Sequence, residues 1–166
     1  MFVALVSLAT LTLPAAVGAR QSPPAAAPAA AVLVKDAYEA MYNLDFGDAL
    51  TLARKSITVA PNDPATHRAV AGVLWLQLLY SRGAVFTDYY LGGRLSQQQI
   101  SLPKPPPEVD AEFKREIEQA ITLSTAELKT SPRSVDARYE LGTAYGLQAS
   151  YLASVEGSML GSGAAV

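Results

Sequence analysis

The stretch DFGDALTLARKSITVAP, residues 45–61, decides the fold, because EIEQAITLSTAELKTSP at residues 116–132 repeats its pattern. In both stretches apolar and small residues recur every three or four positions, which is the period of one helix face. In both, an alanine (Ala49 or Ala120) precedes the final proline by twelve residues. Proline ends such a helix because it has no N–H for the next turn. One helix-and-stop unit occurring twice predicts an all-α fold built from repeats.

A second kind of helix is expected after each of these prolines, over residues 65–80 and again over 135–155. The later one contains LGTAYG, residues 141–146, and here the chain resembles the tetratricopeptide repeat family, whose 34-residue unit has Leu-Gly and Tyr on its first helix. When the chain is aligned with this repeat pattern, the repeat units start at Ala30, Pro64 and Val135. The resemblance implies an α-solenoid of about two and a half repeats, with helix pairs at 32–60 and at 64–81 with 108–130, then a lone helix from about 134.

Small residues in these helices predict close contacts between neighbouring backbones. Gly142 and Ala49 would allow the approach, while Tyr145 and Phe46 would fill the volume beside them. Gly142 and Gly146 also form a GxxxG pattern, which in a polar helix indicates close soluble packing. Replacing Gly142 with leucine is therefore expected to destabilise the fold by overpacking.

The first 31 residues read as export and spacer segments. Residues 1–19 form an uncharged apolar run that ends in Val17-Gly18-Ala19, which suits a signal peptide cleaved before Arg20. No Lys or Arg precedes the run, so an uncleaved membrane anchor is the alternative. Residues 20–31 form a Pro/Ala-rich linker, and the helical domain is expected over 32–166. The protein is thus predicted to be exported, periplasmic or secreted.

Two departures from the repeat pattern stand out. The second unit carries an insertion at about 82–107, whose aromatic cluster is expected to cover the apolar helix before it; a functional loop is the alternative. That cluster comprises Phe86, Tyr89, Tyr90 and Leu91. The third unit has no second helix within residues 158–166, so the chain is interpreted as part of a longer protein. The last helix should then expose an apolar face, comprising Leu141, Tyr145, Leu152 and Val155.

Composition excludes several function classes. The chain has no cysteine and one histidine, so thiol chemistry and zinc sites of the Cys/His kind are excluded. A net charge of −2 gives no cationic surface for nucleic acid. No cofactor, metal or catalytic constellation is predicted, and the chain is expected not to be an enzyme. His67 is expected at the surface, and the charges over 108–118 are expected to form a solvated helix start.

The resemblance implies a non-catalytic protein–protein interaction scaffold, because tetratricopeptide ligands contact the first helices of the repeats. When the ligand-contacting positions of the family are transferred to this chain through the repeat alignment, the implied partner-binding residues are Tyr38, Met41, Tyr42, Arg68, Trp75, Asp136, Tyr139 and Thr143. The partner would be a protein or peptide, and a membrane only if the N-terminal run stays uncleaved. The alternative is the helical, substrate-guiding part of a longer cell-envelope hydrolase whose catalytic domain lies beyond Val166.

Overall fold

The computed structural model describes residues 26–83 and 104–156. Over these residues the chain forms α-helices and no strand, so the predicted all-α class is confirmed. The predicted helix positions from residue 64 onward agree with the structure to within one residue. The helices are α1 (Ala26–Tyr42), α2 (Phe46–Val59), α3 (Pro64–Ser81), α5 (Pro107–Thr130) and α6 (Val135–Ser154).

Local capping explains why the helices begin where they do. The Asp63 carboxylate accepts a hydrogen bond from the Ala65 backbone N–H at 2.9 Å, and Pro64 occupies the first helical position of α3. Ser134 accepts in the same way from the Ala137 N–H at the start of α6. Both caps satisfy an N–H that has no partner within its helix. These side-chain hydrogen bonds therefore explain why the turns before α3 and α6 lie where the sequence predicts them.

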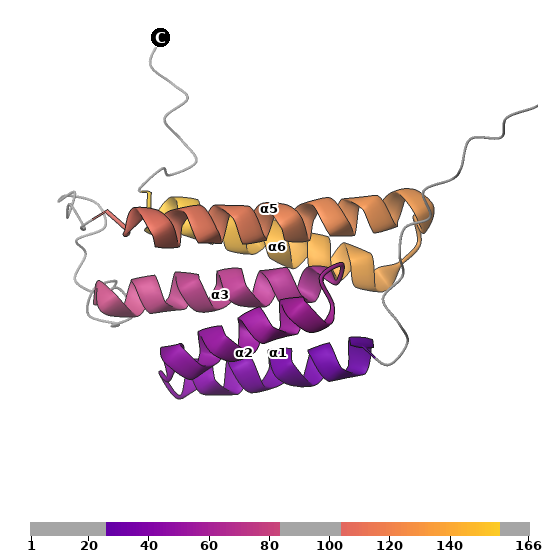
Figure 1. Cartoon of the computed structure of the whole chain (residues 1–166). Coiled ribbons are helices and arrows are strands. Elements are labelled where there is room, and N and C mark those ends of the chain that lie inside the picture. The colour runs from indigo at the N-terminus through magenta and orange to yellow at the C-terminus, as the bar shows by residue number, and fades with distance from the viewer. Residues whose placement is uncertain (1–25, 84–103, 157–166) are drawn as a thin grey trace, which may run out of the picture.

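The helices pack in chain order into a repeat-like array. Each helix packs against the next one along the chain, and α3 also packs against α1 and α6. Figure 1 shows the result, with α1 and α2 at one edge, α3 in the middle, and α5 and α6 at the other edge. The core runs through the array as one cluster of alanines, aliphatic residues and aromatic rings, among them Ala49, Val70, Leu74, Phe113 and Tyr151. Because α3 touches four other helices, it holds the array together.

The first helix begins earlier than the sequence indicated. α1 starts at Ala26, inside the segment that was expected to be a linker up to residue 31. Alanine is the best helix former, and Pro28 falls in the first turn, where a missing N–H costs little. Ala30 is fully buried, so this extra turn packs into the array, and α1 begins before residue 32, where the helical domain was expected to start.

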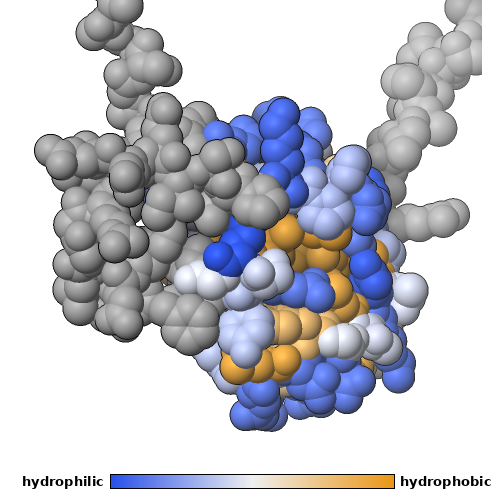
Figure 2. Space-filling model, turned by 90° about the vertical axis from the view of Figure 1, so that its left-hand side faces the viewer, coloured by the Kyte–Doolittle hydropathy of each residue, from blue (hydrophilic) through white to orange (hydrophobic). Residues whose placement is uncertain are grey.

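Three predicted features lie outside the described residues: the signal peptide at 1–19, the aromatic cluster at 86–91 and the segment 158–166. The end of the array where α3 ends and α5 begins is among the described residues. There Phe46 and Tyr80 pack with ring centroids 5.6 Å apart, and Leu44 in the α1–α2 turn is 48% exposed. Figure 2 shows hydrophobic residues at this end, bordered by hydrophilic ones.

The expected close contact at Gly142 is absent from the described structure. Gly142 is exposed, and a Cβ placed there meets no atom within 4 Å. Tyr145, expected to fill core volume, is 52% exposed. At the equivalent phase in the first two units, Ala37 and Ala71 are fully buried, since α1 packs against α2 and α3 against α5. Among the described residues no helix occupies the corresponding place on α6, so the predicted overpacking at Gly142 is wrong.

Replacing Gly142 with leucine should leave the free energy of unfolding unchanged or raise it by up to about 1 kcal/mol, because glycine is a poor helix former. Replacing the buried Ala71 with leucine should lower it by about 2 kcal/mol through overpacking. Urea unfolding at low protein concentration, where association contributes little, measures both. A loss of more than about 2 kcal/mol in the Gly142→Leu variant would contradict the exposed position.

Candidate partner-binding groove

A groove of about 500 Å³ runs between α1, α3 and α6. Each helix contributes side chains spaced three or four residues apart, which places them on one helix face. The groove is thus formed by the first helix of each successive repeat-like unit. Its lining residues are Tyr38, Met41, Tyr42, Arg68, Gly72, Trp75, Leu76, Thr143 and Leu147.

Six of the eight residues predicted for partner binding line this groove. The other two, Asp136 and Tyr139, are exposed on the first turns of α6 and lie outside the lining. Sequence reasoning missed three lining residues, Gly72, Leu76 and Leu147. Gly72 and Leu76 follow Arg68 at four-residue intervals, and Leu147 follows Thr143 by four. Helical spacing could have identified them, because each lies one turn from another lining residue on the same helix face.

The positive charge in the groove is already paired. Arg68 donates from Nε and Nη2 to the two Glu140 carboxylate oxygens, at 2.6 and 3.1 Å, and from Nη1 to the Tyr38 hydroxyl at 2.9 Å. Burial acts to lower the pKa of Arg68, but the Glu140 hydrogen bonds and the neighbouring charges outweigh burial and raise it. Arg68 therefore stays charged and is held by this chain, so a ligand meets a locally neutral surface.

The floor of the groove has little spare room. A Cβ on Gly72 would lie 3.7 Å from Tyr38 and 3.9 Å from Leu147, which is ordinary contact distance. Trp75 donates its Nε1–H to Ser154 at 3.0 Å, so the indole is fixed in orientation and presents its ring to the groove. Tyr42 is 77% exposed at the rim. The groove thus presents aromatic side chains, and the hydrogen bond of Trp75 holds its ring in place without a ligand.

Tyr38 should make the protein sensitive to alkali. Burial raises the pKa of its hydroxyl, and the Arg68 guanidinium offsets only part of that rise. A raised pKa in the folded state means that the stabilisation is complete below about pH 10 and is lost as the pH rises above it. The urea midpoint should therefore stay constant up to about pH 10 and fall as the pH rises further. Tyr38→Phe, which cannot ionise, should show a shallower fall; an identical slope would contradict the assignment.

His67 lies in a buried polar cluster on the other side of α3, contrary to the expectation of a surface position. It is only 7% exposed. Its Nδ1 lies 2.6 Å from the Glu116 carboxylate and its Nε2 lies 2.9 Å from the Pro61 carbonyl oxygen. Glu116 is equally buried, so the charges over 108–118 are not all solvated. Glu112, on the next turn of α5, pairs with Arg54 of α2 through two bonds of 2.9 and 2.7 Å.

This cluster joins the two helix pairs. His67 ties the α2–α3 turn to α5, and Arg54 ties α2 directly to α5. Both ring nitrogens of His67 are engaged by this chain, which accounts for the burial of the only histidine. Over residues 26–83 and 104–156 no three His, Cys, Asp or Glu side chains come close enough together to hold a metal ion.

No helix within the described part of the chain is both long enough and apolar enough to cross a membrane.

Comparisons with known proteins do not assign this chain to a family. No protein-family model, no curated protein and no solved structure matches the chain.

Proposed function

We propose that this chain is an exported, non-catalytic interaction scaffold of the tetratricopeptide repeat type, which holds a peptide segment of a partner protein in the groove between α1, α3 and α6. The observation that carries the proposal is the convergence of six phase-predicted residues on one groove. The helix order supports the repeat assignment, because each helix packs against its neighbour and the first helices of successive units pack together.

The lining indicates the chemistry of the peptide. A groove of about 500 Å³ is within the usual range for small ligand sites and holds only a few side chains. The rim and floor present Tyr42, Trp75, Leu76 and Leu147, whereas Arg68 is neutralised by Glu140. Aromatic anchors and desolvated apolar pockets contribute most of the energy of peptide binding. The ligand is therefore an apolar or aromatic segment rather than an acidic one.

Export rests on the N-terminal sequence alone. Mass spectrometry of the protein from its producing cell should find Arg20 as the first residue. An intact Met1 on a cytosolic product would refute this part of the proposal and leave the groove assignment unaffected.

Selection of peptides from a display library against the full chain tests the groove. Tyr42→Ala removes an exposed ring and should weaken the selected peptides about tenfold. Gly72→Leu should abolish binding, because its side chain would extend into the groove between Tyr38 and Leu147. Gly47→Leu is the matched control, since Gly47 is exposed on α2 with no atom within 4 Å of a Cβ. Unchanged affinity in a folded Gly72→Leu variant, or failure to select any peptide, would overturn the proposal.

A further inference from the structure

A pocket of about 430 Å³ between α1 and the start of α3 adjoins the groove proposed for peptide binding. This α1–α3 pocket shares two side chains with the groove, Tyr38 and Tyr42, which form a wall common to both. Val34 and Ala65 line the pocket alone, whereas Met41, further along α1, lines the groove alone. The two spaces therefore follow one another along the same pair of helices.

The lining of the α1–α3 pocket suits the stem of a long side chain. Ala31, Val34 and Ala65 provide apolar walls, and the two shared tyrosines add ring surface. A lysine or arginine side chain buries its methylene groups on such a surface and keeps its charged end in water. Aromatic rings also attract a cation that lies against their faces.

The charged residues that line the α1–α3 pocket are two carboxylates, of Glu39 and Asp63, and one ammonium group, of Lys35. Nζ of Lys35 lies 2.6 Å from Glu39 and 3.9 Å from Asp36, so its charge is already balanced by this chain. Within residues 26–83 and 104–156 no basic side chain forms an ion pair with Asp63. Asp63 caps α3, but a helix N-terminus carries only about half a positive charge. The rim of the pocket is therefore negative.

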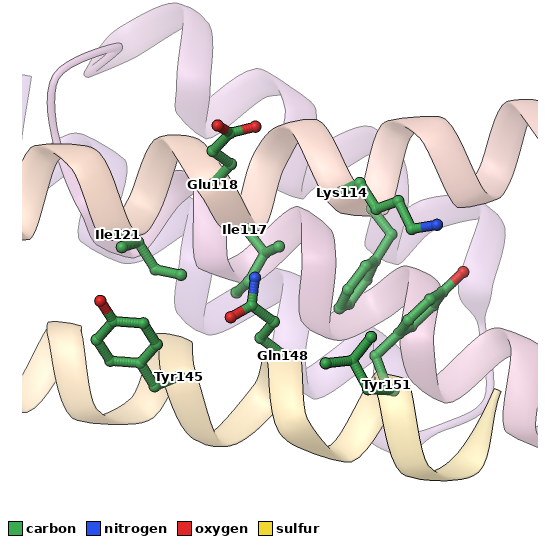
Figure 3. A pocket seen from close by; sticks show the side chains of 9 residues that line it. Lys114, Ile117, Glu118, Ile121, Tyr145, Gln148 and Tyr151 are labelled. Carbon is green, nitrogen blue, oxygen red and sulfur yellow. The ribbon is translucent and has the colours of Figure 1, made fainter. Parts of the chain in front are cut away.

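The groove of about 440 Å³ between α5 and α6 provides a contrast. It is bordered by Tyr145, and its lining holds one carboxylate, of Glu118, and one ammonium group, of Lys114. Figure 3 shows the Glu118 carboxylate pointing away from this groove. A basic side chain in the α5–α6 groove would therefore meet no carboxylate of its lining, unlike one in the α1–α3 pocket.

We infer that the α1–α3 pocket takes a lysine or arginine side chain of the same peptide that occupies the groove. The link to one peptide rests on the proposed function, whereas the preference for a cation rests on the pocket itself. Val34 and Met41 are seven residues apart on α1, which corresponds to about 10 Å along the helix. An extended peptide covers about 10 Å in about three residues. The ligand is then a segment with an apolar or aromatic residue in the groove and a basic residue about three positions away.

Titration of the full chain with a lysine derivative, followed by NMR, tests the pocket without any peptide. N-acetyl-lysine N-methylamide should shift the backbone amide signals of Ala31, Val34 and Ala65 and should saturate with a Kd on the order of 1 mM, as expected for a ligand of its size. The norleucine analogue, which lacks the ammonium group, should bind about fivefold more weakly. Equal affinity of the two compounds would overturn the inference, as would the absence of binding or shifts confined to other residues.

Asp63→Asn removes the charge and keeps the cap of α3, because asparagine caps helices as well as aspartate does. In this variant the lysine compound should bind about two- to fivefold more weakly, while the affinity of the norleucine compound stays the same. Asp48→Asn is the matched control, since Asp48 is an exposed carboxylate of α2 outside the pocket, and it should leave both affinities unchanged. An Asp63→Asn variant that binds the lysine compound as tightly as wild type would show that the charge is not recognised.

The peptides selected for the groove separate this inference from the proposed function. They should carry lysine or arginine about three positions from the apolar residue, and norleucine at that position should weaken binding to the wild-type chain about fivefold. Groove-binding peptides without a basic residue would overturn the inference and leave the proposed function standing. A lysine compound that binds at the pocket when no peptide can be selected would overturn the proposed function and leave the cation preference of the pocket standing.

Discussion

Replacing Glu116 with alanine should lower the free energy of unfolding by about 3 kcal/mol, because it leaves a buried histidine without its carboxylate partner. The Glu116 and His67 side chains are each only 9% exposed, and Nδ1 of His67 lies 2.6 Å from a Glu116 carboxylate oxygen. His67 also holds the Pro61 carbonyl at the α2–α3 turn. Loss of the carboxylate therefore removes the contact with His67 and also weakens the packing of the α2–α3 turn against α5. Urea unfolding followed by circular dichroism measures the change.

Glu118→Ala is the matched control, since Glu118 is an exposed carboxylate on the same helix; its loss should change stability by less than about 0.5 kcal/mol. A double variant with leucine at both His67 and Glu116 should recover part of the loss, because an apolar pair needs no desolvation of charge. If Glu116→Ala costs no more than Glu118→Ala, the buried pair does not stabilise the junction.

Replacing Phe113 with alanine should lower the free energy of unfolding by about 3–5 kcal/mol, the usual cost of emptying the site of a buried aromatic ring. Phe113 is 1% exposed, and its ring stacks on Tyr151 of α6 with centroids 3.7 Å apart. The Tyr151 hydroxyl donates to Asp110 of α5 at 2.7 Å, so the same pair of helices is also joined by a polar contact. Removing the ring should leave a cavity between α5 and α6.

Tyr145→Ala separates this effect from general loss of aromatic surface. Tyr145 borders the same groove but is 52% exposed, so its truncation should cost less than about 1 kcal/mol at low protein concentration. Similar losses for Phe113→Ala and Tyr145→Ala would mean that the described division between core and open face is wrong.

The lining of the groove could be predicted in large part from the repeat phase that the resemblance implies, whereas the electrostatics of the groove could not be predicted. Helical phase placed Tyr38, Trp75 and Thr143 on first helices, and these helices do lie side by side. Nothing local indicated that Glu140 would neutralise Arg68, because the two residues are 72 positions apart and meet only when α6 packs on α3. The same holds for His67 and Glu116, which are 49 positions apart.

The sequence by itself determined the turns that follow α2 and α5 and the helices that begin after them. Asp63 and Ser134 accept hydrogen bonds from N–H groups two or three residues away, and Pro61 and Pro132 have no N–H of their own. Both effects are local, so they can be read without knowing the fold. Only the tertiary structure decided which faces are covered. Ala71 and Gly142 occupy the same phase on equivalent helices, yet one is buried and the other open, because burial depends on whether another helix packs there. A pattern of small and apolar residues marks a face for packing, and the neighbouring helix decides whether that face is covered.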